Sequence, residues 1–110
     1  MQFPVLVVLD VEHGSFFTQF YRTFHLSFVP TIGLELTQGY WSSGVIEQVA
    51  WDEEIKAFIC RPRPNDWLNR DYPDDDQRPS KQNVFEQLVS QGWLRTPNEY
   101  SWASLLGQHV

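Results

Sequence analysis

The sequence predicts an α+β domain built around an antiparallel sheet. Three segments, 32–37, 45–51 and 55–60, alternate their side chains with the period of two that is typical of strands. A nearly continuous apolar run at 5–9 indicates a further strand with both faces covered. Apolar residues recur at helical spacing within 84–89, which predicts an amphipathic helix. With one more predicted strand, these segments give about five strands, in a strongly twisted sheet or a small, partly closed barrel, and one or two C-terminal helices.

Length and composition favour a single globular domain. A chain of 110 residues is long enough to bury a core without a disulfide or metal staple, so we expect residues 1–110 to fold as one unit. One cysteine excludes an internal disulfide and a Cys-x-x-Cys zinc site, which fits a reducing, cytoplasmic setting. The run at 5–9 is too short to span a bilayer and follows no basic segment, so we interpret it as a buried strand.

The first strand is predicted at 3–11, and the segment after it is ambiguous. Aromatic residues within 14–24 recur at helical spacing, whereas those from Phe20 onward also fall on one face of a strand. Aromatic enrichment with few good helix formers favours a strand at 20–28. Pro30 ends that strand because it cannot donate to a ladder.

Two turns join the three alternating segments into a meander. Gln38-Gly39-Tyr40 supplies the first turn and residues 52–55 supply the second. Val45, Val49 and Trp51 share one face of the middle strand by strict alternation. Both faces of the last strand are largely apolar, so we expect it to be central in the sheet.

Residues 61–79 carry four prolines and five aspartates and are predicted to form a long polar loop, whose order the sequence leaves open. A helix is predicted at 80–91, with Ser80 as its N-cap and Gly92 as the left-handed residue that follows it.

The C-terminal segment has two interpretations. A capping-box pattern at 96–99 predicts a short helix from Pro97 to about Leu106. The alternative is a hairpin that pairs 92–95 with 100–103.

Charge and tryptophan content point to a binding protein. The formal net charge is −6, from 14 acidic and 8 basic side chains, which repels nucleic acid and anionic membranes and attracts basic partners. Five tryptophans exceed what one small core needs, so we expect one or two to be partly exposed. Trp41 and Trp67 are the recognition candidates, with Tyr40 beside the former and Glu53 and Glu54 as a negative rim.

The leading hypothesis is therefore a small non-catalytic module, such as an adaptor, an inhibitor or an immunity-type protein. Its partner would be another protein with a basic surface, or a second copy of the chain. No phosphate-binding glycine loop, Gly-x-Ser-x-Gly or His-Glu-x-x-His motif occurs, so no cofactor, metal or catalytic residue is assigned.

The alternative hypothesis is a small hydrolase or metal-dependent enzyme. Asp10 and Glu12 lie on one side of the first strand, and they would act with His13 and His25. The competing interpretation is a polar strand end that faces water.

Three further groups have structural explanations that compete with chemical ones. Asp71 and Asp74–Asp76 lack the spacing of a calcium loop and are expected to be solvated. Cys60 lies in an apolar strand and is expected in the core. A basic and aromatic cluster is opposed by neighbouring aspartates and is expected to pair its charges rather than bind nucleic acid; it comprises Arg61, Arg63, Trp67 and Arg70.

Overall fold

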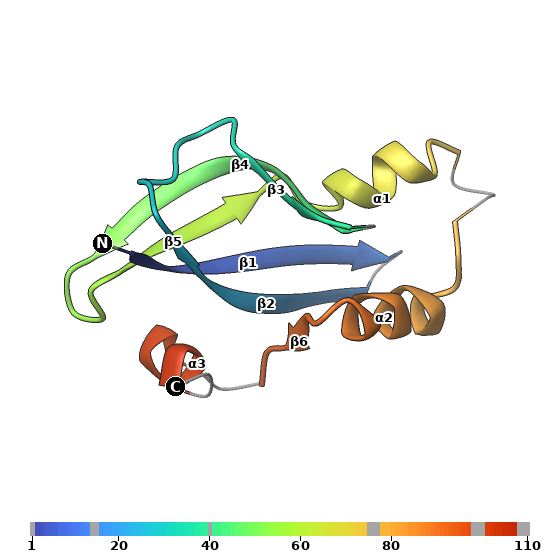
Figure 1. Ribbon diagram of the computed structural model, residues 1–110. Coiled ribbons are helices and arrows are strands. Elements are labelled where there is room, and N and C mark those ends of the chain that lie inside the picture. The colour runs from blue at the N-terminus through green and yellow to red at the C-terminus, as the bar shows by residue number, and fades with distance from the viewer. Residues whose placement is uncertain (1, 14–15, 40, 75–77, 98–100, 108–110) are drawn as a thin grey trace.

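The computed structural model describes residues 2–13, 16–39, 41–74, 78–97 and 101–107, apart from the side chains of Trp41, Trp67, Ala103 and Leu106. A curled, mixed sheet forms the body of the molecule, with three helices against it (Figure 1). The strands are β1 (Phe3–His13), β2 (Phe16–Leu26), β3 (Glu35–Gln38), β4 (Trp41–Asp52), β5 (Ala57–Pro62) and β6 (Leu94–Arg95). The helices are α1 (Asp66–Asp71), α2 (Lys81–Ser90) and α3 (Trp102–Gly107).

The sheet is mixed, so the prediction of a purely antiparallel sheet is wrong. Its strand order is β3-β4-β5-β1-β2-β6, and β5 runs parallel to β1, with Val5 opposite Phe58 and Val7 opposite Cys60. The β3–β4–β5 meander and the β1–β2 hairpin are both antiparallel, as their turns require. The parallel pair forms where these two units meet. Both faces of β1 are apolar, so β1 is suited to a central position between β2 and β5.

The ambiguous aromatic segment is a strand, which confirms the strand interpretation but corrects its bounds. β2 begins at Phe16, opposite His13, and ends at Leu26, opposite Phe3. The meander also differs in its bounds, since β3 is Glu35–Gln38 and shares only residues 35–37 with the predicted 32–37. A register shift between Ile46 and Gln48 interrupts the strict alternation assumed for β4.

The predicted loop at 61–79 contains a helix, α1, that the sequence pattern did not indicate. Its Leu68 side chain is fully buried, and the Asp66 carboxylate accepts the backbone N–H of Val45 at 2.9 Å. Tertiary contacts therefore hold this six-residue helix, which has little apolar periodicity of its own.

α2 confirms the predicted helix and both of its ends. The Ser80 hydroxyl accepts the Asn83 N–H at 3.3 Å as an N-cap. Gly92 has φ +96° after the last turn, and the Trp93 N–H donates back to the Leu88 carbonyl at 3.0 Å, as in a Schellman motif. This return buries the Trp93 indole completely.

The C-terminal segment matches neither interpretation in full. Residues 94–95 form a strand, but it pairs with Phe20 and Tyr21 of β2 rather than with 100–103. α3 begins at Trp102 instead of Pro97, and Thr96 bonds to the Gln19 carbonyl. Asn98 and Glu99 of the predicted capping box lie outside the described residues. No helix in the described part of the chain is long and apolar enough to cross a membrane.

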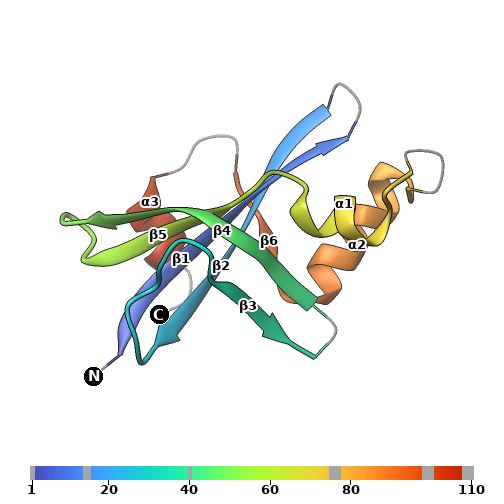
Figure 2. The same ribbon diagram turned by 90° about the horizontal axis from the view of Figure 1, so that it is seen from above.

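Both faces of β1 are buried, as its apolar run predicted. One face joins a core with β2, β4, β5, α1 and α2, formed by Val5, Val7, Leu9, Val11, Phe20, Ile46, Cys60, Leu68, Val84, Leu88 and Trp93. Leu36 of β3, an edge strand, and Phe24 of β2, on the other side of β1, pack on this same core, so the sheet curls around it. The outer face joins a smaller core with α3, formed by Leu6, Val8, Tyr21, Ile59 and Leu105. Figure 2 shows α1 and α2 together at one end of the sheet, away from α3.

Gly44 allows β4 and α1 to approach closely. Its backbone has φ +79°, and a Cβ there would lie 3.0 Å from both the Cβ and a carboxylate oxygen of Asp66. Because Asp66 is fixed by its bond to Val45, the contact has little room to relax.

Gly44→Ala is therefore expected to lower the free energy of unfolding by about 2–4 kcal/mol, from backbone strain and overpacking together. Gly39→Ala is the matched control, since Gly39 has φ +62° but open space around its Cβ position. It should cost only about 1–2 kcal/mol. Denaturant melts of both variants measure the difference, and equal losses would contradict the close-approach argument.

Candidate functional site

The turn between β4 and β5 is held in one conformation by its first acidic residue. The Asp52 carboxylate accepts the backbone N–H groups of Glu54 and Ile55 at 3.0 and 3.2 Å. Lys56 closes the turn with φ +55°, a conformation that side-chain-bearing residues rarely adopt. The chain therefore presents the side chains at 53–56 from a defined backbone.

Trp51, at the end of β4, is large, exposed and fixed in place. Its side chain is 45% exposed, and its indole N–H donates to Glu53 at 2.7 Å. Its ring packs edge-on against Phe58, with centroids 4.9 Å apart, and Phe58 packs likewise against Phe3 at 6.0 Å. We call these three side chains, which come from β4, β5 and β1, the aromatic row.

Acidic groups border the aromatic row. Glu53 and Glu54 are exposed, as predicted, and Glu53 pairs with Lys56. The Lys56 ammonium, and then the Trp51 indole N–H, hold the pKa of Glu53 below its ordinary value. Glu53 is therefore ionised at neutral pH, and three carboxylates within 52–54 outnumber the one ammonium beside them.

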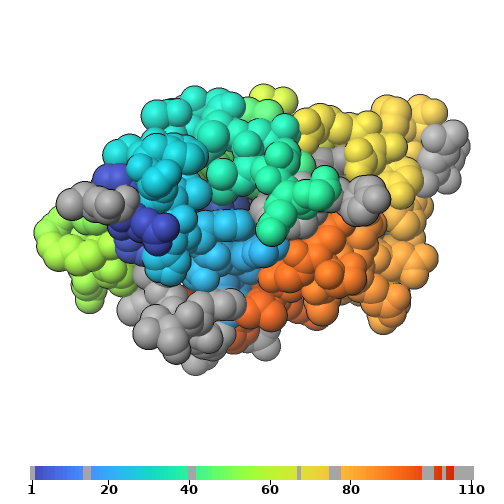
Figure 3. Space-filling view, viewed as in Figure 1, coloured from blue at the N-terminus to red at the C-terminus, as the bar shows by residue number. Residues whose placement is uncertain are grey.

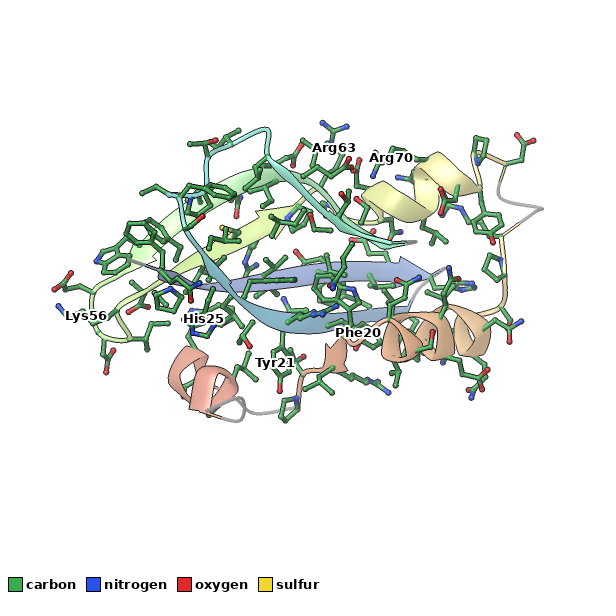
Figure 4. All side chains as sticks on the ribbon, in the orientation of Figure 1. Phe20, Tyr21, His25, Lys56, Arg63 and Arg70 are labelled. Carbon is green, nitrogen blue, oxygen red and sulfur yellow. The ribbon has the colours of Figure 1, made fainter. Side chains whose placement is uncertain are left out.

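This hairpin protrudes at one end of the molecule. In the space-filling view it forms the extreme tip, coloured yellow-green (Figure 3). Lys56 marks the same tip in Figure 4, far from Arg63 and Arg70 near α1. Within the described structure, the Trp51 ring is only partly covered.

The predicted recognition residues are divided between the two ends of β4. Trp41 begins this 12-residue strand, whereas Glu53 and Glu54 follow its end. Trp67 belongs to α1, which approaches the first half of β4 through the bond from Val45 to Asp66. Tyr40 and the side chains of Trp41 and Trp67 lie outside the described residues.

Trp51 is a candidate binding residue that the sequence pattern did not indicate. Strict alternation placed it on a strand face with Val45 and Val49, where burial is the default expectation. The signal that marks it is its position, since it is the last residue of the predicted strand at 45–51 and three consecutive acidic residues follow it.

The residues of the alternative enzymatic hypothesis are not all brought together. Asp10 accepts the Gln19 side-chain amide at 2.8 Å, and the Nε2 of His13 lies 3.1 Å from the Pro79 carbonyl oxygen. His25 lies opposite Pro4, six positions along β1 from Asp10, which corresponds to about 20 Å. Among the described residues, no three His, Cys, Asp or Glu side chains cluster closely enough to hold a metal ion.

The described aspartates of the acidic segment are solvent-exposed and Cys60 lies in the core, as expected from the sequence. Asp71 and Asp74 are exposed, and Asp75 and Asp76 lie outside the described residues. Cys60 is fully buried, and burial raises the pKa of its thiol to about 11. A protonated, enclosed thiol is poorly suited to nucleophilic chemistry.

The basic side chains after β5 pair with carboxylates of the sheet and of α1. Arg63 donates to Glu47 at 2.7 Å, and Arg70 contacts Glu35 at 2.5 Å and Asp66 at 3.7 Å. These carboxylates raise the pKa of both guanidinium groups further above neutrality. Arg61 lies 4.0 Å from Asp10 and over the ring of Trp102. The described residues of this cluster therefore carry paired charges instead of an open basic patch.

Comparison with known proteins identifies no relative: no family model, no curated protein and no solved structure matches the chain.

The buried thiol of Cys60 is expected to resist modification. At pH 8 a pKa of about 11 leaves about 0.1% of the thiol ionised, against about a quarter for an unperturbed cysteine. Reaction of the native protein with a disulfide reagent should therefore be at least about 100-fold slower than reaction of the protein in denaturant. Native and denatured rates within a factor of ten would contradict this placement of the thiol.

Proposed function

We propose that the protein is a non-catalytic binding module that recognises a basic surface of another protein through Trp51 and the acidic turn at 52–54. The observation that supports this most is a tryptophan that is 45% exposed yet held by Glu53 and Phe58. A ring already fixed in its conformation loses little entropy when a partner covers it, and tryptophan is enriched among residues that dominate binding energy.

Charge supports the choice of a basic partner. The turn carries Asp52, Glu53 and Glu54, and the whole chain has a formal net charge of −6. Complementary charge at the border of an interface raises the association rate and discriminates against acidic partners. A lysine- or arginine-rich surface therefore fits this end of the molecule better than nucleic acid or an anionic membrane.

Trp41, Trp67 and Tyr40 remain predicted contributors to recognition. Trp41 begins β4 and Trp67 belongs to α1, whereas the turn at 52–54 is at the other end of β4. We propose a cytoplasmic location, since a single cysteine that is buried in the core fits a reducing compartment.

A peptide-display selection against the immobilised protein tests the proposal. The selected peptides are expected to carry a net positive charge, and their affinity should fall as salt rises. Trp51→Ala should weaken binding of a selected peptide at least tenfold, or about 1.4 kcal/mol, by isothermal titration calorimetry. Glu54→Gln should weaken it less and reduce its dependence on salt.

Ile32→Ala is the matched control for loss of an exposed apolar side chain. Ile32 is 70% exposed in the connection between β2 and β3, and its removal should leave peptide affinity unchanged. Selected peptides without basic residues, or unchanged binding by Trp51→Ala, would overturn the proposed function.

A further inference from the structure

A hollow of about 520 Å³ lies between α2 and the β2–β6 edge of the sheet. Its floor is Phe20 of β2, which is fully buried, and its walls include Phe85 and Val89, one helical turn apart on α2. Figure 1 shows α2 running beside β2 with β6 next to it, and Figure 4 labels Phe20 where the two elements meet. We call this space the α2–β6 hollow, and its volume suits a small organic group.

The apolar walls of the hollow are partly open to water. Val89 is 55% exposed although it belongs to the same helical stripe as the buried Val84 and Leu88. β6 has only two residues, so the sheet ends beside the helix and does not cover this part of it. An apolar ligand would remove these side chains from solvent and gain the free energy of that burial.

Arg95 places a positive charge at the edge of the hollow. Its Nε–H donates to the Thr18 hydroxyl at 3.2 Å, and its guanidinium stacks over Phe85 at 5.2 Å and Phe16 at 5.7 Å. These contacts fix the plane of the group and use its Nε–H, leaving its two outer nitrogens as the donors for a ligand.

No carboxylate among the described residues lies within ion-pair distance of Arg95, in contrast to Arg63 and Arg70. Glu86 borders the same hollow and keeps its negative charge, but its carboxylate accepts the Gln82 side-chain amide at 3.0 Å and forms no ion pair with Arg95. Lys81 adds a second cation nearby, 4.0 Å above the ring of Phe16. This side of an acidic protein is therefore locally suited to an anion.

We propose that the α2–β6 hollow binds a carboxylate that carries an aromatic or branched apolar group. The carboxylate would accept two parallel N–H bonds from the outer nitrogens of Arg95, and the apolar group would lie against Phe85 and Val89. Both a free organic acid and the C-terminal residue of a peptide have this chemistry. The site is separate from the Trp51 hairpin and does not depend on the proposed function.

Titration with 3-phenylpropionate and with its neutral amide, followed by two-dimensional NMR, tests the site. The acid is expected to bind saturably with shifts at residues 82–95, and the amide at least tenfold more weakly. N-acetyl-triglycyl-phenylalanine, with a free carboxylate, forms the second arm. Binding of this peptide alone would identify a peptide C-terminus as the source of the ligand, and equal binding of both acids would show that a free acid suffices.

Arg95→Gln retains a planar polar side chain but removes the charge, so it should abolish the preference for acid over amide. Arg95→Lys should recover part of the preference because it restores the charge without the two-pronged geometry. Arg63→Gln, at an exposed arginine paired with Glu47, is the matched control and should bind as the wild type does. Equal binding of acid and amide, no binding of either acid, or an unchanged preference in a folded Arg95→Gln variant would overturn the proposal.

Discussion

The structure depends on the need to cover both faces of β1. Five consecutive residues of this strand, 5–9, are buried, and they point alternately to the two sides of the sheet. Each such side chain gains about 1.5–3 kcal/mol from full burial, so neither face is stable against water. α1 and α2 close the concave face, and α3 covers part of the outer face through Leu105. The turns and the edge strands are arranged around these two layers.

The candidate binding groups lie where this cover ends. The aromatic row follows β4, β5 and β1 to the end of the sheet opposite α1 and α2, and Trp51 is only partly covered there. The α2–β6 hollow lies at the edge of the sheet beside α2, where β6 is too short to extend under the helix. In both places a rigid aromatic surface is bordered by charge, which is the combination that favours selective binding.

Much of the fold follows from local sequence patterns. The alternation in β4 and β5, the apolar run of β1 and the capped stripe of α2 each depend on residues close in sequence. The parallel pairing of β1 with β5 does not, because a strand that is apolar on both faces suits either direction of partner. α1 was missed because one buried residue, Leu68, anchors it, and one residue makes no periodic pattern.

The candidate site was predictable only in part for the same reason. Glu53 and Glu54 were identified because charge in a turn is a local property. The exposure of Trp51 depends on where the sheet ends, and the irregular register near Gln48 breaks the alternation from which faces were assigned. The hollow joins Phe20 to Arg95, which are neighbours only through β-pairing between segments far apart in sequence.

The central position of β1 also affects how the chain folds as it is synthesised. β1 and β2 pair locally, over 11 residue positions, as soon as both have left the ribosome. The other edge of β1 then stays unpaired until residues 57–62 emerge, since β5 is its neighbour on that side. During this interval a long apolar strand edge is open to pairing with other chains, so the nascent protein has an aggregation hazard that the finished fold conceals.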